Sequence, residues 1–78
     1  MTDKDNIQLH PAFLKRYNAL YRAINAEFDI QNVVLAELVA SCLENNGIVT
    51  ETVRHKFCDR VPAAVFAALE RRALSLDI

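Results

Sequence analysis

Residues 43–66, LENNGIVTETVRHKFCDRVPAAVF, contain the chain's only glycine and one of its two prolines. Gly47 can adopt the left-handed conformation that ends a helix, and the hydroxyl of Thr50 can cap the helix that follows. Pro62 suits the first turn of a further helix, because the N–H that proline lacks has no partner there. The stretch therefore predicts a helix that ends before Gly47, a short helix over 51–58 and another from residue 59 or 61 to about 75.

Two longer helices are predicted upstream of this stretch. From Pro11 to about Glu27, apolar residues recur at spacings of three, four and seven, which is typical of a helix with one buried stripe. Asp29 is a good N-cap for a second helix, which we expect over 30–44. The apolar arc of that second helix is wider than one stripe. Such a helix is either central in a bundle or shared between a core and a partner.

The whole pattern predicts an all-α protein, because no stretch alternates as a strand would. We expect a small bundle of about four helices, with a C-terminal half that resembles a helix-turn-helix. Residues 1–9 form a polar lead-in in this prediction, and residues 10–78 form a single helical domain.

Composition limits the class of protein. A chain of 78 residues buries only roughly 60% of its unfolded surface, so a partner surface is expected. The net charge of −1 argues against a non-specific binder of nucleic acid or membranes. The N-terminal MTDKDNIQLH is too polar for a signal peptide or a membrane span. Cys42 and Cys58 form no CxxC pair, which favours a reducing, cytoplasmic setting.

The helix-turn-helix pattern makes DNA binding an alternative function. In this reading VTETVRHKF is the first helix, CDRVP is the turn and AAVFAALERRAL is the recognition helix. Bases are read by polar side chains near the start of a recognition helix, but this one begins with alanines and a phenylalanine. The basic residues that would contact DNA are Arg54, Lys56, Arg60, Arg71 and Arg72.

Protein binding is the leading prediction. Small residues at four-residue spacing allow another helix to approach closely, and an adjacent phenylalanine can serve as an apolar anchor. The sequence therefore predicts a non-enzymatic helical regulator or adaptor of bacterial type that binds another protein or itself, as a homodimer. The residues expected to form the interface are Leu35, Val39, Ala63, Phe66, Ala67 and Leu74.

No metal site, cofactor or catalytic site is predicted. His55 and Cys58 share a helical face, and His10 and Cys42 are the only further candidates for a set of four ligands. Structural zinc sites show closely spaced ligand pairs on both sides, and only one irregular pair occurs here. The same His55 and Cys58 lack a third residue that would orient them for nucleophilic catalysis.

Two family resemblances point towards small helical regulators. Residues 34–53, VLAELVASCLENNGIVTETV, resemble the small bacterial YmgB/AriR and YcgZ connector proteins; the matching residues are Leu35, Glu37, Leu38, Val39, Leu43, Gly47 and Thr50. The segment DRVPAAVF is more distantly similar to the end of the Hha/YmoA family, through Asp59, Arg60, Val61 and Pro62. Both resemblances imply regulators that act largely by binding other proteins, and the first implies dimers. The aromatic-rich context of the second family is absent from this chain.

Overall fold

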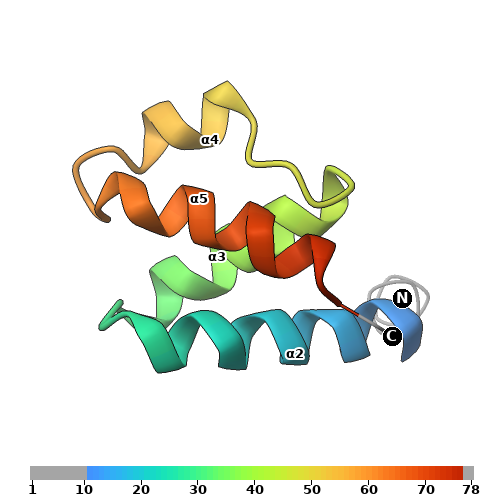
Figure 1. Ribbon diagram of the computed structural model, residues 1–78. Helices are drawn as coiled ribbons and strands as arrows, with labels where there is room; N and C mark the ends of the chain where they lie inside the picture. The colour runs from blue at the N-terminus through green and yellow to red at the C-terminus, as the bar shows by residue number, and fades with distance from the viewer. Residues whose placement is uncertain (1–10, 77–78) are drawn as a thin grey trace, which may run out of the picture.

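The computed structural model describes residues 11–76, and the predicted lead-in at residues 1–9 lies outside that part of the chain. The described residues form four helices and no strand: α2 (Pro11–Glu27), α3 (Asn32–Glu44), α4 (Glu51–Lys56) and α5 (Ala63–Leu74). Helices α2, α3 and α5 pack against one another, and α4 lies on the opposite side of the molecule from α2 (Figure 1). The all-α prediction is confirmed.

Helix α2 has the predicted bounds and buries the centre of the predicted stripe. Pro11 is its first residue, and Leu20 and Ile24 are fully buried at the centre of the stripe. Tyr17 and Tyr21 are only half-buried at the side of the stripe that faces α3. The helix therefore contributes both to the core and to the surface beside α3.

Helix α3 is central in the bundle, but it begins two residues later than predicted. Its N-cap is Gln31, which makes no capping bond with its side chain, so the prediction of Asp29 as the cap was wrong. The chain stays non-helical through Ile30, whose side chain packs against the core. We attribute the later start to this packing. The five buried residues of α3 are Val34, Leu35, Leu38, Val39 and Cys42.

The turn after α3 uses two left-handed residues instead of one. Asn46 has a φ of 59° and Gly47 a φ of 85°. The Gly47 N–H donates to the Cys42 carbonyl at 2.8 Å and the Asn46 N–H donates to the Leu43 carbonyl at 3.2 Å. This pair of bonds is the Schellman arrangement, in which Asn46 occupies the left-handed cap position. The predicted left-handed Gly47 is confirmed, with Asn46 as an additional left-handed residue.

Helix α4 begins as predicted and ends two residues early. The Thr50 hydroxyl accepts a bond from the Val53 N–H at 3.3 Å, which confirms the predicted cap. Phe57 is already the C-cap residue, and its ring is almost completely buried. The short helix is thus attached to the core mainly through the residue that ends it.

Helix α5 begins at Ala63, so the predicted start at Asp59 or Val61 was wrong. Residues 57–61 instead form a turn in which the N–H groups of Arg60 and Val61 both donate to the Phe57 carbonyl. Pro62 has an extended backbone, with a ψ of 153°, and therefore precedes the helix as its N-cap. We expect Val61, Val65, Leu69 and Leu76 to form one apolar stripe from the sequence; the first three are buried, and Leu76 is partly buried against the core.

Candidate functional site

The six residues predicted to bind a partner divide into two groups. Leu35 and Val39 are completely buried, and Phe66 is 4% exposed, so none of the three offers a surface. That part of the prediction was wrong about exposure, because all three side chains belong to the hydrophobic core. The other three predicted residues are exposed and follow one row of α5: Ala63, Ala67 and Leu74.

The basic residues predicted for DNA binding are mostly engaged in ion pairs. Their partners are carboxylates elsewhere in the bundle: Arg54 pairs with Glu70 at 3.2 Å, Lys56 with Glu37 at 2.6 Å, Arg71 with Glu27 at 3.9 Å, and Arg72 also with Glu27. The hydrogen bond from Arg72 lowers the pKa of the Glu27 carboxyl group, with a smaller contribution from the nearby positive charges. Among residues 11–76, Arg60 is the one predicted cation that forms no ion pair.

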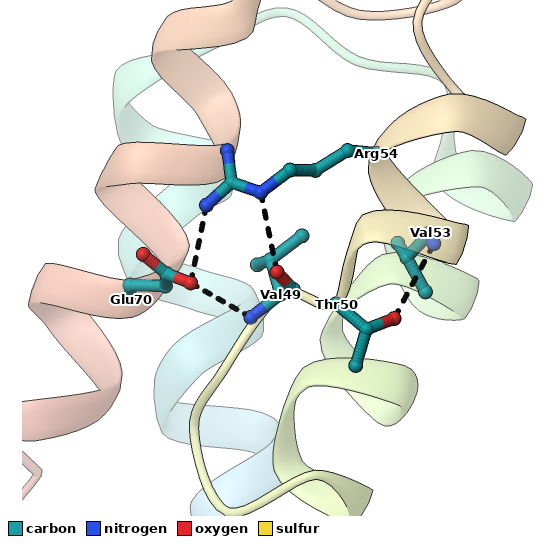
Figure 2. Close-up of polar contacts among 5 residues, drawn as sticks. All are labelled: Val49, Thr50, Val53, Arg54 and Glu70. Atoms are coloured by element: carbon teal, nitrogen blue, oxygen red, sulfur yellow. Dashed lines mark hydrogen bonds and ion pairs between the residues drawn. The ribbon is translucent and has the colours of Figure 1, made fainter.

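Arg54 is part of a small network that attaches the start of α4 to α5. Its guanidinium donates to the Val49 carbonyl and to the Glu70 carboxylate, both at 3.2 Å, and the same carboxylate accepts from the Val49 N–H at 2.9 Å (Figure 2). The guanidinium also lies 5.6 Å from the centre of the Phe66 ring, within range of a cation–π contact. These contacts give Arg54 a structural role in this fold.

The unit formed by α4 and α5 differs from the predicted helix-turn-helix. Helix α4 has only six residues, and residues 57–62 separate it from α5, whereas the motif usually has a turn of three or four residues. The first turns of α5 expose Ala63, Ala64 and Ala67. None of these side chains can donate or accept a hydrogen bond from a base edge.

An open groove of about 450 Å³ lies between α2 and α3. It is lined by Tyr17, Asn18, Tyr21, Asn32, Val33 and Ala36. Tyr21 donates a hydrogen bond from its hydroxyl to Asn32 Oδ1 at 3.1 Å, which holds the two helices together at one end of the groove. Val33 is 72% exposed. The groove thus presents two tyrosine rings and a valine on a mainly apolar surface.

The tyrosines belong to an aromatic row along α2. The ring centres of Phe13 and Tyr17 are 6.3 Å apart, and those of Tyr17 and Tyr21 are 5.9 Å apart. Partial burial raises the pKa of the Tyr17 hydroxyl, with a smaller contribution from Tyr21. The Tyr17 hydroxyl is therefore a neutral donor at physiological pH, and the rings form a wall with a polar rim.

Sequence reasoning did not single out this groove, although the apolar stripe of α2 includes Tyr17 and Tyr21 and the wide apolar arc of α3 includes Val33. The apolar arc of residues 30–44 was correctly found to be too wide, but its surplus member is Val33, whereas the prediction chose Leu35 and Val39. Val33 lies at the edge of the arc, away from the side occupied by Leu38 and Cys42. The angular position of each residue around the helix, measured from the centre of the apolar arc, would have identified Val33 as the exposed residue.

The cysteine and histidine residues do not converge. Cys42 is buried, and this burial raises the pKa of its thiol to about 11, with a smaller effect from the Glu70 charge. Cys58 is exposed and its thiol lies 3.7 Å from the Asp59 carboxylate. Within residues 11–76 no three His, Cys, Asp or Glu side chains are grouped so that they could bind a metal ion, and His10 lies outside those residues.

No family model, curated protein or solved structure matches this chain. The resemblances to the YmgB/AriR and YcgZ proteins and to the Hha/YmoA family therefore stay expectations. None of the helices between residues 11 and 76 has the length and apolar character required to cross a bilayer. The functional argument depends on the geometry of the groove and on the distribution of charge.

Proposed function

We propose that the protein is a small, non-enzymatic helical regulator or adaptor that binds a protein partner, or a second copy of itself, through the groove between α2 and α3. The observation that carries this proposal is Val33, an apolar side chain that is 72% exposed beside the half-buried rings of Tyr17 and Tyr21. Tyrosine is enriched in protein interfaces because its ring adds apolar area and its hydroxyl finds a polar partner. A reducing cytoplasm of a bacterial-type cell fits the two free thiols.

The distribution of charge favours protein binding over DNA binding. Four of the five predicted DNA contacts are in ion pairs with carboxylates, and each would have to leave its pair to neutralise a phosphate. The alternative still has a direct test. A protein that used these cations on DNA would retard a duplex at low salt, and the binding would weaken steeply as salt increases.

A photo-crosslinking residue at position 33 tests the proposed function. The matched control places the same residue at Ile48, which is also apolar and 57% exposed but lies beyond the other end of α3, about 18 Å away along the helix axis. We expect a protein to be crosslinked from position 33 and not from position 48. The captured protein, once purified, should bind Val33→Glu at least about tenfold more weakly than the wild type, a loss of about 1.4 kcal/mol.

The control variant for the binding measurement is Ile48→Glu, which should bind like the wild type. Val33 is in the first turn of α3, where a carboxylate is favourable to the helix, so Val33→Glu should fold normally. Equal capture from both positions, or equal affinity of the two variants, would contradict a binding function for the groove.

A further inference from the structure

Two cations lie beside the groove on its α2 side. Lys15 comes three residues before Asn18 and Arg22 comes four residues after it, so both share the helix face of this groove residue. Both side chains are exposed, and neither forms an ion pair with another residue of the range 11–76. The groove therefore has a basic edge, formed by Lys15 and Arg22.

The positive charge of the basic edge is confined to one side of the groove. Glu27 is the only acidic residue of α2, and its carboxylate already pairs with Arg71 and Arg72. Helix α3, which forms the other side of the groove, contains no basic residue. A ligand therefore gains from negative charge only where it faces α2. Nucleic acid does not meet this requirement, because a DNA duplex carries phosphates along both of its strands.

An apolar strip runs along α2 next to the basic edge. Leu14 is 40% exposed and lies seven residues before Tyr21, one of the two groove tyrosines, so these two side chains share a face of the helix. Lys15 and Arg22 are also seven residues apart. At a rise of about 1.5 Å per residue, the strip and the edge each extend for about 10 Å. The apolar and the charged features thus repeat together over two helical turns.

From this arrangement we infer that the partner of the groove is a protein that presents an amphipathic helix with one acidic edge. This helix lies along α2, with apolar side chains over two turns against Leu14 and the tyrosines, and with carboxylates seven residues apart against Lys15 and Arg22. An extended peptide would need a sheet edge for backbone pairing, and residues 11–76 contain no strand. The groove is also open, whereas sites for small molecules enclose most of the ligand. The inference rests on the proposed function, since it specifies the partner of the same groove.

The probe that tests this inference is a synthetic helical peptide. It is built from alanine, with leucines along one stripe and with two glutamates, seven residues apart, beside that stripe. The protein has two tyrosines and no tryptophan, and both tyrosines line the groove, so its tyrosine fluorescence reports the binding of a peptide without aromatic residues. We expect this acidic peptide to change the fluorescence and to bind at least about tenfold more tightly than an isomer whose glutamates lie opposite the leucines. Binding should weaken as salt increases, because the basic edge is exposed.

Reversing the charges of both partners tests which edge of the helix faces α2. The double variant Lys15→Glu with Arg22→Glu should bind the acidic peptide at least about tenfold more weakly, and it should prefer a peptide with lysines in place of the glutamates. Arg22→Glu alone should also weaken binding of the acidic peptide. Its matched control is Arg60→Glu, which changes an exposed cation outside the groove and outside the ion pairs of residues 11–76, and which should bind like the wild type. Urea unfolding of each variant separates a loss of binding from a loss of folding.

Three results would overturn the inference and leave the proposed function standing, provided that position 33 still crosslinks to a protein. They are equal affinity for the two glutamate isomers, no binding of any peptide, and a double variant that still prefers the acidic peptide. Binding of a DNA duplex at low salt that Arg22→Glu weakens equally would also overturn it, because the basic edge would then serve a polyanion. Self-association that Arg22→Glu abolishes would make a second copy the occupant, with the same consequence. No peptide binding together with no crosslink from position 33 would contradict both the inference and the proposed function.

Discussion

Replacing Gly47 by alanine tests whether the turn after α3 needs a residue that tolerates the left-handed conformation. Gly47 has a φ of 85°, where an L-residue with a Cβ atom is unfavourable by about 1–2 kcal/mol. An added Cβ would also lie 3.3 Å from the Cβ of Ala73, which is buried on α5. That distance is tight, so α5 must shift by a few tenths of an ångström, at a cost of about 1 kcal/mol or less.

One effect acts in the opposite direction. Alanine restricts the unfolded chain, which favours the folded state by about 0.4–1 kcal/mol. The sum predicts that Gly47→Ala lowers the free energy of unfolding by about 1–2 kcal/mol. For a domain of this size the midpoint of thermal unfolding should fall by roughly 5–15 °C. Urea unfolding followed by circular dichroism measures the free energy directly.

A double-mutant cycle separates the two contributions. Ala73→Gly removes the atom that the new Cβ would meet, so Gly47→Ala should be less destabilising in that background by the contact contribution alone. The remaining destabilisation belongs to the backbone conformation. A Gly47→Ala protein as stable as the wild type, or more stable, would refute the reasoning, because only the effect on the unfolded chain would then be acting.

Three further predictions concern the helix cap, the ion pairs and the thiols. Thr50→Ala should lower the free energy of unfolding, measured by urea unfolding, by about 1 kcal/mol, because the cap of α4 is lost. The control is Thr52→Ala, which changes an exposed residue within α4 and should alter the free energy of unfolding by less than about 0.5 kcal/mol. The pKa of Glu27 is lowered in the folded protein, so its ionised carboxylate contributes fully to stability at a pH above its ordinary pKa of 4.5. That contribution is lost as the pH falls through the lowered pKa of the folded protein. The difference in free energy of unfolding between the wild type and Glu27→Gln should therefore shrink below about pH 4.5, and a constant difference would contradict the pairing. An alkylating reagent near neutral pH should label Cys58 in the native protein and Cys42 only after unfolding, because Cys42 is buried. The Cys42 pKa of about 11 also leaves roughly a hundredfold less thiolate than the ordinary value of 9.0 would. Mass spectrometry that found both cysteines labelled equally fast would contradict this.

The helices were predictable because their signals are local. The stripe of α2, the Gly47 turn and the Thr50 cap each depend on residues within a few positions, and the structure has all three. The errors concern helix starts, which depend on contacts with residues that are distant in the sequence. We attribute the later start of α3 to the packing of Ile30 against the core. An aspartate suited to capping, Asp29, cannot override that contact.

The candidate site was less predictable than the helices, because a site depends on how helices are rotated in the bundle. The sequence showed that α3 has more apolar surface than one stripe requires, but not which edge remains free. The rotation of α3 that buries Leu35 and Val39 is the one that leaves Val33 exposed beside Tyr17 and Tyr21. The predicted anchor Phe66 is also buried, and the Arg54 guanidinium lies against its ring.

The same packing also explains why the basic residues do not form a surface for DNA. Glu27, Glu37 and Glu70 come from α2, α3 and α5, and each reaches a cation on another helix. These pairs stabilise the arrangement of the helices only modestly, since they are exposed, but they neutralise the C-terminal half of the chain. Among residues 11–76, Arg60 is the one predicted DNA contact outside such pairs, and a single arginine does not make the basic patch that a DNA-binding domain needs.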